Sequence, residues 1–418
     1  MIVIQTTCSF GSKVTGSLGR LCRMSLSSLK MIVVTILCCI ALQFAAGTVQ
    51  PQTPEQCRRG LYPPSNSTDV ETFVINLDLP PSDRWTELAR AKKSEVKKIH
   101  GVLRDLLSSI FEGRLLHLID SQMPRLLHSL PSPFKEEIVA LSHHSGLPLG
   151  EVVLYNVFYE FFTVCTSIVA QDKKGQMYHA RNLDFGLFLG WDTQNHTWAM
   201  TEALRPTIVN LDFQRSNRTV FKTAGFAGYV GILTAIKPNA FTLTVNERFQ
   251  LDGGYIGIIE WLLGDHSEQW VGFLTRQIME NVTSYETAKQ EVIRTKLIAP
   301  AYFILGGNGS REGIILTKDR NSDISDVYRL EDSPDKWFLL ETNYDHWKAP
   351  PSYDDRRNPG MNCMRNMSQQ NLGFEGLFNV LSSQPVLNQL TTYTALMEVA
   401  TGRLETYIQD CQPPCTLF

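Results

Sequence analysis

The sequence predicts an α+β fold in which a mostly helical segment comes first and a core of mixed strands and helices begins at Cys165. Apolar residues recur every three or four positions between about Ser82 and Val164, whereas short β-rich runs follow Cys165. The chain has 418 residues, of which 43% are hydrophobic and 19% charged, so it can bury a sizeable core. A formal net charge of −3 without a Lys/Arg cluster excludes a basic nucleic-acid-binding protein.

Residues 1–47 have the pattern of a leader with a signal peptide. Four basic residues and no acidic residue precede or flank an apolar run from Met31 to about Ala46, and Ala45-Ala46-Gly47 offers the small residues that a signal peptidase accepts. The run is short for a membrane span, and an uncleaved signal anchor is the alternative. We therefore expect a secreted, lysosomal or granule-lumen protein.

Six N-x-[ST] sequons agree with a lumenal chain and predict exposed glycosylation sites at Asn66, Asn195, Asn217, Asn281, Asn308 and Asn366. The cluster Gly306-Gly307-Asn308-Gly309 lacks a nucleotide-binding pattern and is interpreted as a glycosylated turn. Loss of the leader lowers the net charge to about −7, and the nine histidines can reverse its sign at acidic pH. Such a chain would be attracted to an anionic membrane in an acidic lumen, unless the histidines are scattered for unrelated reasons.

The segment before Cys165 is predicted to hold several helices. Ser82 is a fair N-cap for a helix whose apolar stripe comprises Trp85, Leu88, Val96, Ile99, Leu103, Leu106 and Ile110. Ser132-Pro133 predicts a second helix with Pro at its first position. The apolar stretch Leu149–Phe162 is interpreted as a buried core helix, with insertion into lipid as the alternative.

After Cys165 the pattern predicts strands interrupted by helices. The expected strands are residues 166–170, 176–180, 241–245, 302–305, 313–317 and 337–340. The expected helices are residues 254–263, 270–281 and 284–295, with another pair beyond Phe374.

Five cysteines remain once the leader is removed, and an odd number leaves one of them free in an oxidising compartment. Cys411 and Cys415 can close a short loop, and Cys57 could then join Cys363, which leaves Cys165. A zinc site at Cys411 and Cys415 is disfavoured because no second ligand pair has the required spacing.

Asp172-Lys-Lys-Gly175 is predicted to be the turn between the first two strands after the boundary. A turn centred between the two lysines places Cys165 opposite Asn182, with Arg181 beside it and Asp184 just beyond. Arg181 would then favour the thiolate, and Asp184 could hold a cation nearby.

A nucleophilic thiol needs a base, and two candidates exist. His179 is near in sequence, but strand alternation points it to the same face as Arg181. If the chain is cut before Cys165, the new α-amine can serve its own side chain as general base. The third interpretation is that Cys165 is an unreactive buried cysteine.

Five motifs together resemble the acid ceramidase family of N-terminal-nucleophile hydrolases. They are Cys165-Thr-Ser-Ile-Val-Ala, Arg181-Asn-Leu-Asp184-Phe, Asn246-Glu-Arg-Phe249, Glu341-Thr-Asn-Tyr-Asp345 and Asp354-Asp-Arg-Arg357. The sister family of N-acylethanolamine acid amidases shares the first and fourth motifs and is the alternative. The stretch from Phe185 to Trp191, Asn246-Glu-Arg-Phe249 and the Cys57/Cys363 pair are similar to ceramidases instead.

The resemblance implies an αββα sandwich behind a helical α subunit. Residues 48–164 would be the α subunit and residues 165–418 the β subunit, separated by self-cleavage between Val164 and Cys165 and linked by disulfide. Cys165 would be the nucleophile, Arg181 and Asp184 would order it, Glu247 and Asn343 would line the oxyanion side, and Arg356 would support the site.

The implied reaction is hydrolysis of ceramide, or of another N-acyl sphingoid base, to a sphingoid base and a fatty acid through a thioester. It needs no metal or other cofactor. The implied partners are a saposin-type activator and the anionic lysosomal membrane surface, and the implied location is the lysosome lumen with partial secretion. Two rival classes remain: a catalytically silent lipid-binding glycoprotein and a structural interaction protein that stays one uncut chain.

Overall fold

The structure is a computed structural model. It describes residues 57–412, apart from 66–69, 112–126, 128, 159–162, 186–189, 193, 196, 250–256, 258–259, 262–263, 321–323 and 325, together with Cys415. The leader 1–47, the sequon at Asn66 and most of the helix expected at 254–263 therefore lie outside the described residues. No helix in the described ranges is long and apolar enough to cross a membrane.

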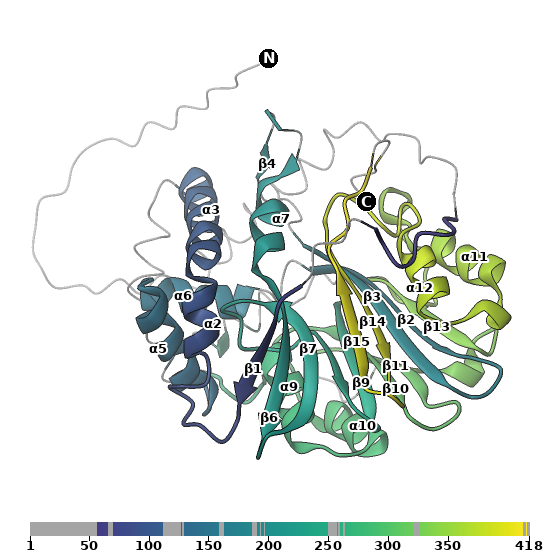
Figure 1. Cartoon of the computed structure of the whole chain (residues 1–418), viewed down its shortest axis with the longest axis horizontal. Helices are drawn as coiled ribbons and strands as arrows, with labels where there is room; N and C mark the ends of the chain where they lie inside the picture. Colours follow the sequence, from purple (N-terminus) through teal and green to yellow (C-terminus); the bar gives the residue numbers. More distant parts are fainter. Residues whose placement is uncertain are drawn as a thin grey trace, which may run out of the picture. The chain divides into compact units, whose positions relative to one another are not determined.

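Two β-sheets pack face to face (Figure 1). In order across the larger sheet, its eight strands are β1 (Thr72–Asn76), β6 (Ile208–Arg215), β7 (Arg218–Phe226), β8 (Thr234–Lys237), β9 (Phe241–Glu247), β10 (Ala301–Gly307), β11 (Gly313–Lys318) and β12 (Asp326–Arg329). The smaller sheet consists of β13 (Phe338–Glu341), β2 (Thr163–Gln171), β3 (Met177–Phe185), β14 (Thr391–Glu398) and β15 (Arg403–Tyr407). A separate short hairpin pairs β4 (Trp191–Asp192) with β5 (Thr197–Trp198).

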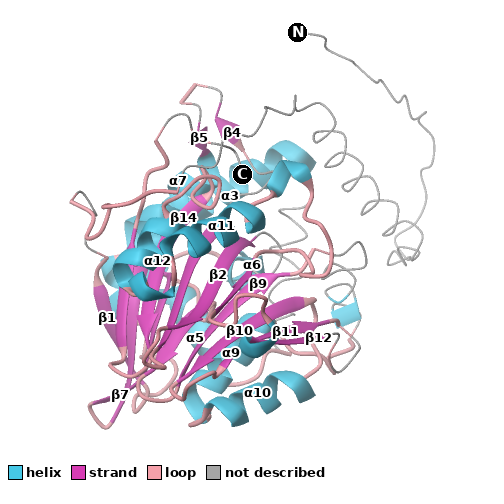
Figure 2. Ribbon diagram, turned by 90° about the vertical axis from the view of Figure 1, so that its right-hand side faces the viewer, coloured by secondary structure: helices cyan, strands magenta, loops and turns pink. Residues whose placement is uncertain are grey.

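Helices cover the outer face of each sheet, which gives the αββα sandwich that the family resemblance implied. Figure 2 shows α11 (Arg357–Met367) and α12 (Phe374–Leu381) over the smaller sheet. The larger sheet shares its core with α9 (Val271–Asn281) and α10 (Tyr285–Arg294). Strand β2 is buried on both faces, because Val169 packs between the sheets while Ile168 and Ala170 pack against the helices.

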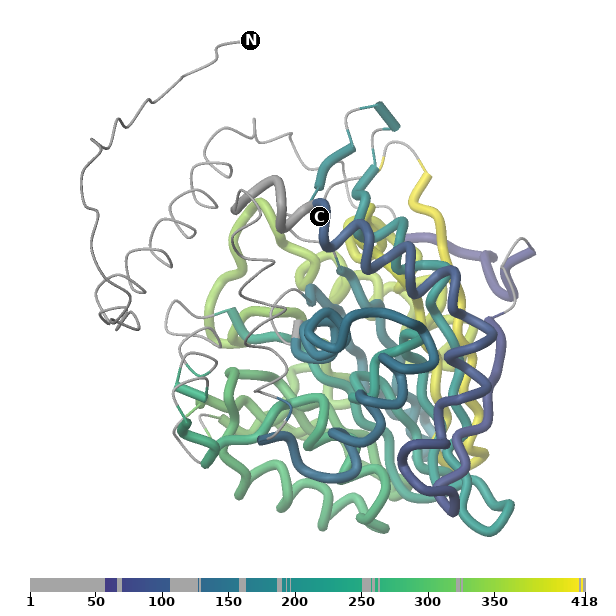
Figure 3. The backbone as a smooth tube through the Cα atoms, turned by 90° about the vertical axis from the view of Figure 1, so that its left-hand side faces the viewer, coloured from purple at the N-terminus to yellow at the C-terminus, as the bar shows by residue number. Residues whose placement is uncertain are grey.

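The segment before Cys165 contributes α2 (Thr86–Ala91), α3 (Lys93–Phe111), α5 (Phe134–Ser145) and α6 (Leu149–Phe158), whose blue tubes face the viewer in Figure 3. The described part of α6 is almost entirely buried, so the core-helix interpretation is confirmed there. One more helix, α7 (Ala199–Leu204), follows the β4–β5 hairpin.

A buried ion pair joins the segment before Cys165 to the segment after it. Arg276 of α9 donates to both carboxylate oxygens of Glu137 of α5, and neither side chain is exposed to solvent. The guanidinium also lies over the rings of Trp85, Phe134 and Phe213, with its carbon 5.0–5.5 Å from the three ring centres.

All six expected strands are present, as are the helices expected at 270–281 and 284–295. The expected pair of helices beyond Phe374 is wrong, because only α12 is helical and β14 and β15 follow it. Strand β14 is covered on both faces and therefore lacks the alternating polarity of a half-buried strand.

Three boundaries differ from the sequence prediction. Trp85 rather than Ser82 precedes α2, since a turn occupies the residues between them, and Pro133 is the N-cap of α5 rather than its first residue. Strand β2 begins at Thr163, so one strand runs through the Val164–Cys165 bond instead of starting at it.

Strand β1 was not expected at all. It belongs to the front segment and pairs in parallel with β6, from Thr72 opposite Asn210 to Asn76 opposite Gln214. The mostly helical segment before Cys165 thus also supplies one of the two edge strands of the larger sheet.

The glycine cluster at 306–309 is only partly a turn. Gly306 and Gly307 complete β10, while Asn308 and Gly309 are exposed at its end. A Cβ atom on Gly306 would come within 2.9 Å of both Thr242 Oγ1 and Val169 Cγ2, so close packing between the sheets requires glycine there.

Candidate active site

Cys165 lies on β2 with its side chain in the space between the sheets, and it is completely buried. Arg181 on the neighbouring strand β3 donates a hydrogen bond from Nη2 to Cys165 Sγ. The same guanidinium is fixed by hydrogen bonds to Leu233 O at 2.7 Å and Thr234 Oγ1 at 3.0 Å. The predicted contact between the thiol and a guanidinium is therefore present.

The strand register differs by one residue from the prediction. Cys165 pairs with Leu183, and Asn182 pairs with Thr166. The connection holds five residues rather than four, since Asp172 N donates to Gln176 O and Gly175 adopts a left-handed conformation with φ of +88°.

Burial raises the pKa of the Cys165 thiol to about 11, although Arg181 lowers it and Asp184 raises it further. The expectation that Arg181 favours the thiolate is right in direction, but desolvation has the larger effect on the pKa of the thiol in this structure. The free cysteine is therefore a neutral thiol in this state.

Asp184 does not join the thiol and the guanidinium on one face, because it follows Leu183 and points to the opposite face of β3. There its carboxylate accepts hydrogen bonds from Thr391 Oγ1 at 2.6 Å and Asn388 Nδ2 at 3.1 Å. Arg356 Nη1 lies 3.6 Å away and is its cationic partner. Burial raises the pKa of Asp184 to about 6 against the opposing effect of Arg356.

Arg356, the N-cap residue of α11, links several groups of the site. It donates to Cys165 O at 2.6 Å and to Asn343 Oδ1 at 2.8 Å. Asp354 holds the guanidinium through two hydrogen bonds of 2.6 and 3.0 Å. The Asp354–Arg357 motif therefore positions one buried arginine against the backbone of Cys165.

Asn343 and Glu247 contact each other and the backbone next to the Val164–Cys165 bond. Asn343 Oδ1 accepts from Cys165 N at 2.9 Å, and its Nδ2 donates to Glu247 O at 2.7 Å and Thr163 O at 3.3 Å. Glu247 Oε2 accepts from Thr163 N at 3.1 Å. Burial raises the pKa of Glu247 to about 8, so its carboxyl is neutral at acidic pH.

His179 lies on the same face of β3 as Arg181, as the alternation predicted, but its hydrogen bonds go to Thr242 and Thr244 and not to the thiol. Burial and Arg181 lower its pKa to about 3. The structure thus gives no contact for His179 as the base of Cys165.

Asn388 and Thr391 were missed by the sequence analysis. They reach Asp184 from a loop and strand more than 200 positions later, and neither belongs to a quoted motif. Asp354 could have been identified from the sequence, since it is the first residue of the quoted motif Asp354–Arg357.

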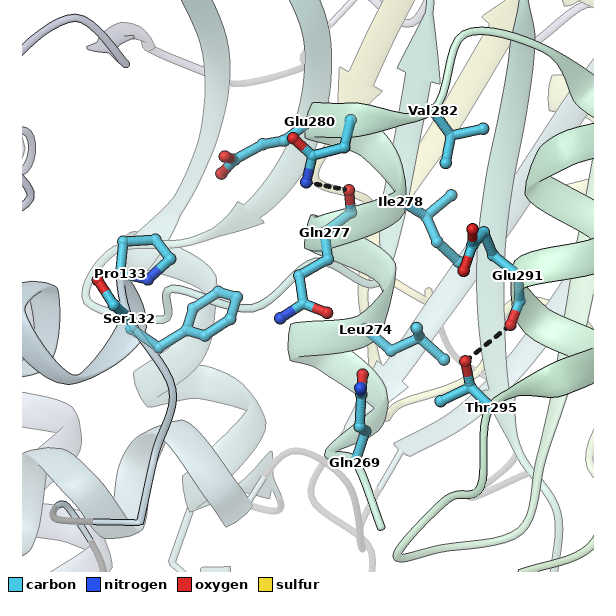
Figure 4. Close-up of a pocket in the computed structure, with 12 residues that line it drawn as sticks. Ser132, Pro133, Gln269, Leu274, Gln277, Ile278, Glu280, Val282, Glu291 and Thr295 are labelled. Atoms are coloured by element: carbon cyan, nitrogen blue, oxygen red, sulfur yellow. Dashed lines mark hydrogen bonds between the residues drawn. The ribbon is translucent and has the colours of Figure 1, made fainter. Parts of the chain in front are cut away.

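Outside the site, the described residues include the disulfides Cys57–Cys363 and Cys411–Cys415, the pairings considered from the sequence. Within the described ranges no three His, Cys, Asp or Glu side chains gather as a metal site. The five described sequon asparagines are exposed: Asn195, Asn217, Asn281, Asn308 and Asn366. The pocket of about 330 Å³ between α9, α10 and the start of α5 is lined by none of the active-site residues (Figure 4).

Comparison with known proteins gives two family matches. Residues 165–358 match the linear amide C–N hydrolases of the choloylglycine hydrolase family, and residues 68–130 match the beta subunit of N-acylethanolamine-hydrolyzing acid amidase.

Several proteins are similar over most of the chain. Acid ceramidase of Homo sapiens is 49% identical over 388 residues, which cover 90% of this chain and 98% of the human protein. Acid ceramidase of Rattus norvegicus is 47% identical over 369 residues, covering 87% and 93%. The solved structure of a Caenorhabditis elegans N-acylethanolamine-hydrolyzing acid amidase (NAAA) ortholog is 32% identical, with a TM-score of 0.50, and covers 59% of this chain and 100% of its own.

Proposed function

The chain belongs to the acid ceramidase family, and from that premise we propose that it hydrolyses ceramide to sphingosine and a free fatty acid with Cys165 as the nucleophile. One observation carries the assignment of the site. Three buried side chains each hold a different group of Cys165: Arg181 the thiol, Asn343 the amide N–H and Arg356 the carbonyl oxygen. A cysteine that served packing alone would not require three such partners.

The first step of the proposal is self-cleavage between Val164 and Cys165. Sγ attacks the carbonyl carbon of Val164, the C–N bond breaks, and the acyl group passes to sulfur as a thioester while the nitrogen takes up the thiol proton. Water then hydrolyses the thioester and leaves a free α-amine on Cys165. The family match that begins at residue 165 supports this boundary between residues 48–164 and 165–418.

Cleavage would supply the general base that the intact chain lacks. It would also give the substrate access to Cys165. Asn343 Oδ1 already accepts from the Cys165 nitrogen at 2.9 Å and would keep the new amine beside its own thiol. Cys165 is fully buried in the uncut chain, so a lipid amide cannot reach it before the preceding residues move.

Turnover repeats the same chemistry on ceramide. The thiol attacks the amide carbonyl, the sphingosine amine leaves with a proton, and water hydrolyses the resulting thioester to the fatty acid. Asn343 Nδ2 and the protonated carboxyl of Glu247 are the donors proposed for the developing oxyanion. Arg181, Arg356 and Asp184 order the nucleophile, and the mechanism uses no cofactor.

The setting proposed for this reaction is the lysosome lumen, with partial secretion. The similarity to acid ceramidases supports an acidic compartment. With a pKa of about 8, the carboxyl of Glu247 would be protonated there and could donate. The Cys57–Cys363 disulfide would keep the two chains covalently linked after the cut. A saposin-type activator and the anionic membrane surface are the proposed partners, because ceramide has to leave a membrane to reach the site.

Two measurements test the proposal. After incubation at acidic pH, a reducing gel should show two chains, and N-terminal sequencing of the larger should read Cys-Thr-Ser-Ile-Val. In matched mixed micelles, N-acylsphingosine should be hydrolysed faster than N-palmitoylethanolamine. A fully active single chain contradicts the cleavage step, and the reverse substrate order favours the amidase of N-acylethanolamines.

A further inference from the structure

A chain of buried hydrogen bonds runs between the two sheets behind the nucleophile. It comprises His179 of β3, Thr244 and Asn246 of β9, and Ser167 of β2. We propose that this chain, called here the inter-sheet relay, positions Asn343 for the reaction. The inference rests on the proposed function, because Asn343 is assigned there to the oxyanion.

The relay has three links, all between fully buried side chains. His179 Nε2 lies 3.0 Å from Thr244 Oγ1, which lies 3.0 Å from Ser167 Oγ. Ser167 Oγ in turn lies 2.8 Å from Asn246 Oδ1.

The relay ends on the backbone just before Asn343. Asn246 Nδ2 donates to Glu341 O at 3.0 Å and to Thr342 O at 2.8 Å. Strand β13 ends at Glu341, so the amide of Asn246 replaces the strand ladder where that ladder stops. It thereby fixes the peptide units that lead into Asn343, whose own contacts with Cys165 N and Glu247 O are 2.9 and 2.7 Å.

The available protons determine which group donates and which accepts in each hydrogen bond of the relay. Both N–H groups of Asn246 are used on carbonyls, so its Oδ1 accepts the hydroxyl proton of Ser167. Ser167 Oγ then accepts from Thr244, and Thr244 Oγ1 must accept from His179. The imidazole therefore carries its proton on Nε2, and bonds aligned in this way reinforce one another.

The other ring nitrogen makes a contact that does not lead to the site. With the ring proton on Nε2, His179 Nδ1 accepts the hydroxyl proton of Thr242 at 2.9 Å, and Thr242 shares this proton with Gly306 O, which lies 3.1 Å from its Oγ1. Thr242 and Thr244 thus touch the same imidazole from the same strand, but only Thr244 connects it to Asn343. They form a matched pair of sites for substitution.

The test compares Thr244→Val, Thr242→Val and Thr244→Ser in the full-length protein. Thr244→Val removes the central hydroxyl at constant shape, and we expect self-cleavage and kcat to fall by about tenfold to a hundredfold with KM nearly unchanged. Thr244→Ser keeps the hydroxyl and should restore most of the rate. Thr242→Val should stay within about twofold of the parent at a similar loss of stability.

A second measurement is independent of activity. Nitrogen-15 NMR of the histidine-labelled Cys165→Ala chain should show His179 as the neutral Nε2–H tautomer. A protonated Nδ1 would overturn the relay, as would equal losses of rate in the two valine variants or a loss expressed only in KM.

These outcomes are separable from failure of the proposed function. If ceramide is not the substrate, the parent will show no ceramide turnover, but the same three variants can be ranked by their rates of self-cleavage. If the relay is wrong, the parent will cleave itself and hydrolyse ceramide while the two valine variants behave alike.

Discussion

The carboxyl of Glu247 predicts how the reaction depends on pH. Its pKa is raised to about 8 by burial, so it is a neutral donor below that pH and a buried anion above it. An anion beside Thr163, two positions before Cys165, opposes the negative charge that develops when the thiol attacks. The contribution of Glu247 to the rate of self-cleavage should therefore fall as the pH rises through about 8.

The magnitude follows from the titration. With a pKa of about 8, roughly nine-tenths of the molecules carry the proton at pH 7 and roughly one-tenth at pH 9. Glu247→Gln keeps an uncharged donor of the same shape, while its Cys165 thiol ionises over the same pH range as in the parent. The rate of the parent relative to Glu247→Gln should therefore fall about tenfold between these pH values.

The assay is a quantitative gel that follows the cut in purified uncut protein between pH 4.5 and 9. Glu341→Gln is the matched control, because burial also raises the pKa of Glu341 to about 8, while its carboxylate accepts from Thr342 N and not from residues 163–165. Relative to Glu247→Gln, this control should show the same decrease as the parent. A parent rate that keeps a constant ratio to Glu247→Gln at all pH values, or a decrease that disappears in Glu341→Gln, would refute the role given to Glu247.

Four further predictions follow from other contacts. Cys165→Ala and Cys165→Ser should each abolish both the cut and ceramide hydrolysis in a folded, secreted protein, as measured by gel and by fatty-acid release; normal hydrolysis by the alanine variant would rule out the mechanism. Asn343→Ala should lower kcat by about 10²–10³ through loss of a preorganised donor, as steady-state kinetics will show. Burial lowers the pKa of His100 to about 4, so the folded chain should lose about 3 kcal/mol between pH 7 and pH 4 as the unfolded state binds a proton there, and His100→Leu should remove this loss in urea titrations at the two pH values. Cys57→Ser, with Cys363→Ser to avoid a new free thiol, should let the two cut chains separate on a non-reducing gel, whereas the parent should migrate as one band.

The sequence predicts the centre of this fold better than its edges. Strand β2 carries a dense β-branched run, and its turn to β3 is marked by Asp172 and Gly175, so the pairing of the two strands follows from local chemistry. The register was displaced by one residue because the left-handed Gly175 adds a position to the turn. A single extra residue of this kind moves every side chain relative to its cross-strand partner.

The partners of the site depend on contacts that local patterns do not encode. Asn388 and Thr391 reach Asp184 only because β14 pairs with β3 in the folded sheet. Strand β14 has no alternating polarity, and β1 is a short edge strand beside a helical segment, so neither pattern is typical of the strand formed. The resemblance, by contrast, identified Arg356 and Asn343 because their motifs are contiguous.

The parallel pairing of β1 with β6 gives the cut a thermodynamic consequence. In the uncut chain this pairing is intramolecular, so its free energy does not depend on how much protein is present. After a break at residue 164 the same strand would belong to a second polypeptide, held at a high effective concentration by the Cys57–Cys363 bond. If that disulfide is then reduced, association of the strand with the larger sheet becomes bimolecular. The temperature or denaturant concentration at the midpoint of unfolding will then depend on the protein concentration.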